Sequence, residues 1–325
     1  MAHSHIFASL RAAAAALLAG TTLVACSGTE SDTAATEAST SNVSKIAATT
    51  QVWADVASAV TGDDVEAVIT GANVDPHHYE ATAADIAKLR EADLVIANGG
   101  AYDAGLYDAV DEAKLIHAIP LAEGAQDHDH DHDHDHDHDH DHDHDHDHDH
   151  DHDHDHDHDE IEHAWFVPEK VSEVAKEIEQ RAGGSASEVT KRMDAVSERL
   201  GQLDHVHLAM TEPIAAGLLY GTELDDVTPE QYARSTLNHT DPSIDAIAAF
   251  IEVIEQGSLD FLVVNPQSTN SATQRLIDAA NDNNVPIIEI TETPPAGTNF
   301  LDYIEEVTDT IERVVAAAEP KDHAA

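Results

Sequence analysis

The sequence predicts an α/β protein made of two lobes joined by a long rigid helix. Short apolar runs alternate with segments whose apolar residues recur three and four positions apart, as in parallel strands connected by helices. The chain has 325 residues, a length that corresponds to two domains at roughly 100–200 residues each. Hydrophobic residues make up 41% of the chain, enough for a sizeable core.

The alternation divides the chain into a first lobe at 45–183, a linking helix at 184–203 and a second lobe at 204–325. Strands are predicted at 45–50, 65–70, 93–98, 114–119, 205–211, 261–265 and 285–291. Helices are predicted at 53–60, 83–92, 102–113, 167–180, 185–203, 213–220, 242–256, 270–281 and 299–318. Ser185 or Ser187 is the expected cap of the linking helix.

Charge and cysteine content exclude several classes of protein. The chain carries 15 Lys and Arg against 65 Asp and Glu, a formal net charge of −50. Such a surface repels phosphate backbones, so we expect no nucleic-acid partner. A single cysteine, Cys26, excludes an intramolecular disulfide framework and a cysteine-rich zinc ribbon. Any metal chemistry must therefore use histidines and carboxylates.

The N-terminus has the layout of a signal peptide at 1–25, with Arg11, a short apolar run and small residues before Cys26. The apolar run is too short to remain as a transmembrane helix. Leu23-Val24-Ala25-Cys26 resembles the lipobox of bacterial lipoproteins, so Cys26 is the expected lipidation site. Residues 26–44 are rich in Ser, Thr, Ala and Glu and predict a flexible tether.

A low-complexity tract fills residues 127–159 with strictly alternating aspartate and histidine, sixteen of them histidines. It lacks apolar residues, so we expect a disordered surface loop. Imidazoles and carboxylates coordinate metals, which predicts an accessory metal-binding loop. Its histidines include His128, His130, His132, His154, His156 and His158. A replication-slippage expansion without a selected role is the alternative for the exact length.

Four further residues are candidate ligands of one metal site. His77, in Asp-Pro-His-His-Tyr-Glu, follows a predicted strand, and His163 precedes a predicted helix. Glu212 and Glu292 each follow a predicted strand of the second lobe. Parallel sheets place ligand groups at the carboxyl ends of their strands. Two ligands from each lobe would hold a metal in the cleft between the lobes.

The chain resembles the metal-specific solute-binding lipoproteins of ABC importers, chiefly the zinc branch. Four features carry the resemblance: DPHHYE at 75–80, HAWFVP at 163–168, the His-rich loop and the lipobox. The resemblance runs from Lys45 to about Ala318. It implies two lobes joined by a rigid helix, a bare divalent metal between them, and delivery to a membrane permease. It also implies an extracytoplasmic protein anchored by lipid to the outer face of the membrane, which we expect to be monomeric.

By motif match, His77 and His163 are the first two ligands of that family. Zinc-type members usually supply a third histidine where this chain has Glu212, and Glu292 matches the usual fourth ligand, an aspartate, only approximately. Carboxylates suit manganese better than imidazoles do. The His-rich loop argues for zinc, which is therefore the expected metal, with manganese as the alternative.

The other histidines have simpler interpretations. His78 is expected at the surface, and His117 within a strand. His205 and His207 share one face of a predicted strand but precede its carboxyl end, which favours packing or solvent roles. His239 fits a helix-entry loop capped by Asp241, although we leave open whether His205, His207 or His239 assists in binding.

An enzyme is not expected. The chain has no His-Glu-x-x-His zinc-protease motif, no Gly-x-Ser-x-Gly elbow and no phosphate-binding Gly-Lys-Ser/Thr loop. A metallohydrolase using His77, His163 and one carboxylate is the alternative from the enzyme class. An extracellular zinc buffer or adhesin with the same fold is the other alternative.

Overall fold

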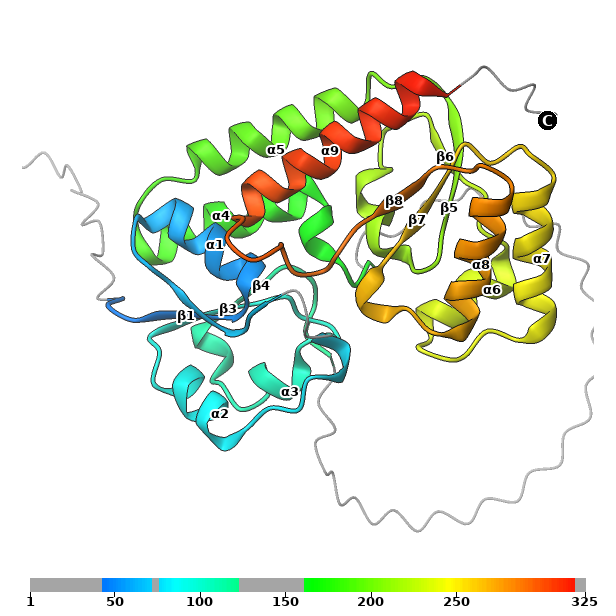
Figure 1. The fold of residues 1–325 in the computed structure, drawn as a ribbon. Helices are drawn as coiled ribbons and strands as arrows, with labels where there is room; N and C mark the ends of the chain where they lie inside the picture. The colour runs from blue at the N-terminus through cyan, green and yellow to red at the C-terminus, as the bar shows by residue number, and fades with distance from the viewer. Residues whose placement is uncertain (1–42, 72–75, 123–160, 319–325) are drawn as a thin grey trace, which may run out of the picture. The chain divides into compact units, whose positions relative to one another are not determined.

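The computed structural model describes residues 43–71, 76–122 and 161–318. Two four-stranded sheets form its frame, and every strand pair in both sheets is parallel (Figure 1). The predicted α/β class with two parallel-sheet lobes is therefore confirmed. The signal peptide, the tether, Cys26 and the tract at 127–159 lie outside the described residues.

The first sheet has the order β2-β1-β3-β4. All residues of its third strand are buried, because helices cover the sheet. Its strands are β1 (Ile46–Thr50), β2 (Glu66–Ile69), β3 (Leu94–Ala97) and β4 (Leu115–His117). The helices of this lobe are α1 (Gln51–Thr61), α2 (Ala83–Arg90) and α3 (Ala104–Tyr107). The helix predicted at 102–113 is thus reduced to one turn and a separate 3-10 turn, η2 (Glu112–Lys114).

The second sheet repeats this topology in the order β6-β5-β7-β8. Its strands are β5 (Val206–Met210), β6 (Leu224–Asp226), β7 (Phe261–Val264) and β8 (Ile287–Glu289). Its helices are α6 (Glu230–Leu237), α7 (Ile244–Glu255) and α8 (Ser271–Asp282). β6 and α6 were not predicted. Two of the three residues of β6 are exposed aspartates, so the strand has no apolar run to reveal it.

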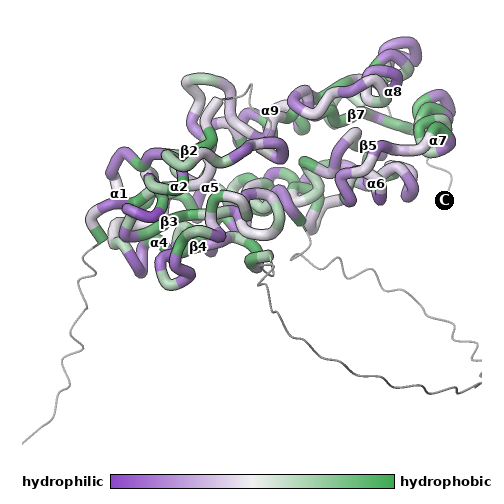
Figure 2. The backbone as a smooth tube through the Cα atoms, turned by 90° about the horizontal axis from the view of Figure 1, so that it is seen from below, coloured by the Kyte–Doolittle hydropathy of each residue, from purple (hydrophilic) through white to green (hydrophobic). Residues whose placement is uncertain are grey.

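The hydrophobic residues are concentrated in the elements that form the interiors of the two lobes. Figure 2 shows hydrophobic residues concentrated along β3 and α7, which pack into the interiors of the two lobes. Among the described residues, no helix has both the length and the apolar character that a bilayer crossing requires.

Three helices connect the lobes, where the sequence predicted one. α4 (Pro168–Ala182) and α5 (Ser187–Leu200) lead from the first sheet to the second, and α9 (Phe300–Ala317) returns from β8 to pack against α1 and α5. Asp55 of α1 accepts a hydrogen bond from the backbone N–H of Phe300 at 2.8 Å. A carboxylate of the first lobe therefore binds the first backbone N–H of α9.

The two predicted helix caps differ in outcome. Ala186 directly precedes α5 and has no capping side chain, while the hydroxyl oxygen of Ser185 accepts from the backbone N–H of Ser187, the first residue of the helix, at 3.3 Å. Ser243 caps α7 by accepting from the N–H of Ala246, so Asp241 does not have that role.

Candidate metal centre

Both predicted histidine ligands lie beyond the carboxyl ends of first-lobe strands. His77 is on the 3-10 turn η1 (Pro76–His78), after β2, and its side chain is 12% exposed. His163 is buried and precedes the turn η4 (Ala164–Phe166). The amide of Asn98, directly after β3, donates to the carbonyl of Glu162 at 2.8 Å. This bond fixes the His163 segment to the strand end where open sheets present ligands.

Aromatic rings restrict the orientation of both imidazoles. The ring of His77 meets the ring of Tyr102 edge-on, with centroids 5.0 Å apart. The ring of His163 meets that of Trp165 in the same way at 5.2 Å. Trp165 and Phe166 are both buried in the core, so they wall off the site from the protein interior.

The two carboxylates come from the second lobe and are held by hydrogen bonds. Glu212 follows β5 and Glu292 follows β8, with Glu292 only 1% exposed. The side-chain amide of Asn265 donates to Oε2 of Glu212 and to Oε1 of Glu292, each at 2.9 Å. Oε2 of Glu212 also accepts from the hydroxyl of Ser268. Oε2 of Glu292 accepts from the hydroxyl of Tyr102 at 2.9 Å, a bond between the lobes.

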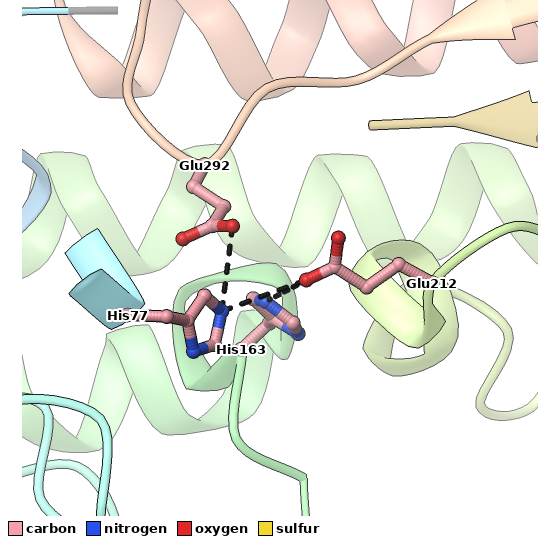
Figure 3. A group of neighbouring side chains, drawn as sticks. All are labelled: His77, His163, Glu212 and Glu292. Carbon is pink, nitrogen blue, oxygen red and sulfur yellow. Dashed lines mark ion pairs between the residues drawn. The ribbon is translucent and has the colours of Figure 1, made fainter. Parts of the chain in front are cut away.

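The four predicted ligands converge. Figure 3 shows His77, His163, Glu212 and Glu292 pointing toward one another, and one ligand atom from each lies within 4.8 Å of the others. Nε2 of His77 is 3.5 Å from Oε1 of Glu212 and 3.4 Å from Oε1 of Glu292. Nε2 of His163 is 3.5 Å from the same Glu212 oxygen. Tetrahedral zinc with bonds near 2.1 Å requires ligand atoms about 3.4 Å apart, and these three separations agree with that spacing.

The pKa values of His77 and Glu212 indicate how the metal-free site is charged. Burial favours neutral His77, but hydrogen bonds to Glu212 and Glu292 outweigh it and raise the pKa of His77 to about 11. Burial likewise opposes ionisation of Glu212, yet His163 and His77 hold its pKa well below the usual range. At neutral pH the metal-free site therefore keeps a proton where a metal would supply positive charge.

A second group, Glu162 and His239, lies next to His77. Nδ1 of His77 is 3.8 Å from Oε1 of Glu162, and Nε2 of His239 is 3.5 Å from Oε2 of Glu162. The His239 side chain is 53% exposed, and its backbone is left-handed, with φ of 50°. Sequence reasoning missed Glu162, although it directly precedes His163. It placed His239 in a loop and left open whether this residue assists in binding; the structure places it against Glu162 and His77.

A cleft of about 520 Å³ gives access to this region. Its walls come from both lobes, including His77, Tyr102, Glu212, His239 and Gln267. Clefts of this volume also hold small organic ligands, so the convergent histidine and glutamate side chains, rather than the size of the cleft, indicate a metal ion.

The remaining described histidines lie elsewhere or make no ligand contact. His117 is on β4, with Nδ1 2.9 Å from the carbonyl of Ile119, in agreement with a structural role. His78 lines the cleft but is not part of the four-ligand group. His205 and His207 lie at the opposite end of β5 from Glu212.

Comparison with known proteins shows the family of the chain. A family model described as ZnuA, zinc-uptake complex component A periplasmic, matches residues 46–314. None of the curated proteins matches the chain significantly.

Solved structures share the fold at low sequence identity. The laminin-binding adhesin Lmb from Streptococcus agalactiae is 13% identical, with a TM-score of 0.56, covering 83% of this chain and 99% of its own. The Zn(II)-bound ZnuA-like domain of AdcA from Streptococcus pneumoniae is 16% identical, with a TM-score of 0.52, covering 84% and 98%. FpvC from Pseudomonas aeruginosa, in complex with Mn²⁺, is 15% identical, with a TM-score of 0.57, covering 84% and 98%. The match to a longer zinc-bound AdcA chain covers 59% of that chain.

Proposed function

Because the chain belongs to the family of periplasmic zinc-uptake components, we propose that it captures a bare zinc ion at His77, His163, Glu212 and Glu292 and delivers it to an ABC permease. The observation that carries the proposal is the convergence of one ligand atom from each residue within 4.8 Å. Two neutral imidazoles and two carboxylates around a divalent ion make a neutral site, which lowers the cost of burying it. Release requires the permease to draw the ligands apart.

The hydrogen bonds around the carboxylates favour zinc over manganese. Oε2 of Glu212 accepts from Ser268 and Asn265, and Oε2 of Glu292 accepts from Tyr102, so Oε1 of each carboxylate faces His77. Oε1 of Glu292 also accepts from Asn265 and keeps a second lone pair for the metal. Four single-atom ligands complete the tetrahedral shell typical of zinc. Manganese prefers about six, mostly oxygen, ligands and would need further donors. Manganese is the second candidate, since carboxylates form half of the donor set.

Metal identity is tested by loading full-length protein with an equimolar mixture of zinc and manganese. We expect anomalous scattering at the zinc edge, and none at the manganese edge, between the two histidines. Manganese at that position would reverse the assignment of the metal.

The transport role is tested in cells. Deletion of the gene should abolish uptake of isotopic zinc from zinc-poor medium, and the wild-type copy should restore it. Unchanged uptake would favour an extracellular zinc buffer or adhesin. The resident metal is also not expected to catalyse hydrolysis, because four protein ligands leave no open coordination position.

The tract at 127–159 is proposed as an accessory metal collector. It ends shortly before Glu162 and His163, so it is joined by sequence to the cleft. Its seventeen aspartates attract cations, and its imidazoles lose their affinity as they protonate below a pKa of about 6.5. Deleting the tract should leave one tight site while removing most of the weaker zinc equivalents, measured by calorimetric titration. Loss of the tight site would contradict the collector role.

Lipidation of Cys26 is proposed to keep the protein at the outer face of the membrane. A Cys26→Ala variant should appear in the medium or remain as uncleaved precursor. A free thiol at a cleaved wild-type N-terminus would contradict it.

A further inference from the structure

A second cluster of metal-ligating side chains lies at the amino end of the second sheet. His205 directly precedes β5, and His207 is its second residue. Alternate residues of an extended chain face the same side, so the two imidazoles are neighbours. In the parallel register His207 is directly opposite Asp225 of β6. Two adjacent strands thus place two imidazoles and a carboxylate on one surface.

The three side chains are close enough to share one ion. The rings of His205 and His207 are edge-on, with centroids 5.2 Å apart. Nε2 of His207 is 3.7 Å from Oδ2 of Asp225. One ligand atom from each of the three residues lies within 4.8 Å of the others.

One contact orients His205 for coordination. Its Nδ1 lies 3.0 Å from the carbonyl oxygen of Glu223, which can only accept a hydrogen bond. Nδ1 therefore carries the proton and Nε2 keeps the lone pair that binds a metal. Metal-ligating histidines commonly donate their other N–H to a carbonyl or carboxylate in this way.

The surroundings favour a cation and leave room for water. Asp204, Glu223 and Asp225 are all exposed acids in these segments. His205 is also exposed, and neither it nor His207 belongs to a hydrophobic cluster of the described residues. A metal held here would have three protein ligands and at least one open position for water.

We propose that His205, His207 and Asp225 form a second, weaker binding site for a divalent transition metal of the zinc type. Glu212 is five positions after His207, a span of about 17 Å at roughly 3.3 Å per residue. The two groups are therefore too far apart to share an ion. The nitrogen and oxygen donors suit zinc or copper better than calcium or magnesium.

The test uses crystals of the full-length chain, because anomalous scattering separates metal positions that a titration would sum. In crystals equilibrated with a tenfold molar excess of zinc, we expect one peak between His77 and His163 and a second beside His205 and His207. In the His205→Gln/His207→Gln variant the second peak should vanish while the cleft peak stays, which also shows that the variant folds. Absence of the second peak in wild-type crystals, or its persistence in the double variant, would overturn the proposal.

A solution measurement completes the test with a matched pair of variants. Ring ¹⁵N resonances of His205 and His207, assigned by their loss in the double variant, should shift as zinc is added beyond one equivalent. Asp225→Asn should raise the zinc concentration at the midpoint of this shift about tenfold. Asp204→Asn removes a neighbouring exposed carboxylate outside the site and should change it less than twofold. Equal effects of the two variants would mean that Asp225 acts only by general attraction, and the three-ligand site would be wrong.

Discussion

The two ends of strand β5 carry metal-ligating groups of opposite design. At the carboxyl end, Glu212 joins residues from three other segments in a buried cleft, with ligand atoms 3.4–3.5 Å apart. At the amino end, His205, His207 and Asp225 come from two adjacent strands; His205 and Asp225 are exposed, and His207 is partly buried. The first group is preorganised by burial and by hydrogen bonds to its carboxylates, whereas the second is brought together by the register of two strands. The variants below measure how much affinity that support provides.

Removing a buried ligand should have the largest effect. Replacing Glu212 or His163 by Ala leaves the other ligands without a complete shell, so we expect zinc affinity to fall at least ten- to hundredfold. This equals roughly 1.4–2.8 kcal/mol at 1.4 kcal/mol per decade. Calorimetry in competition with a chelator measures it, with Asp225→Ala as the control that leaves the cleft intact. If Glu212→Ala binds like wild type while His207→Ala or His239→Ala does not, the third ligand is misassigned.

Acidification should weaken the cleft site by about tenfold per pH unit. The pKa of His77 is raised to about 11, so zinc must displace its proton throughout the neutral range. We expect about one proton released per zinc at pH 7, measured by calorimetry in buffers of different ionisation enthalpy. His77→Gln should abolish the release. Zinc binding without proton release in the wild type would contradict the charged His77.

The raised pKa of His77 also affects the stability of the metal-free protein. A raised pKa means that protonated His77 stabilises the folded state. That contribution is complete below the unfolded value of about 6.5 and is lost as pH rises through about 11. Metal-free wild type should therefore lose more thermal stability than His77→Gln between pH 7 and pH 11.

A smaller effect is expected from the hydrogen bond between the lobes. Tyr102→Phe removes the hydroxyl that donates to Oε2 of Glu292, and loss of such a supporting contact typically costs about tenfold in metal affinity. Tyr107→Phe is the matched control, because its hydroxyl donates to the carbonyl of Gly100 instead. Equal affinities for the two variants would show that the tyrosine does not support Glu292.

The smallest effect should come from His239. Its side chain is 53% exposed and contacts Glu162 rather than the two ligand glutamates, so His239→Ala should lower zinc affinity less than threefold, about 0.7 kcal/mol. Equilibrium competition with a fluorescent chelator resolves such a difference. A loss above tenfold would make His239 a ligand and the four-residue set incomplete.

Most of the fold was predictable because its signals are local. The apolar runs at β1, β3, β5 and β7 identified central strands, and helix periodicity identified α7, α8 and α9 within a few residues. β6 was missed because Asp225 and Asp226 replace the apolar residues of a buried strand, and an edge strand requires fewer of them. The cap of α7 was mispredicted because Ser243, two positions after Asp241, is the residue that directly precedes the helix and accepts from one of its N–H groups.

Hydrophobic periodicity located the strand ends before His77, Glu212 and Glu292 and the helix after His163, because periodicity and the residues that follow it are local properties. The folded structure alone shows that Tyr102 and Asn265 hold the glutamates, that Glu162 and His239 lie against His77, and that α9 returns to Asp55. These contacts join residues up to 245 positions apart. Nothing in a local pattern specifies such a partner, because it is selected by the packing of the two lobes.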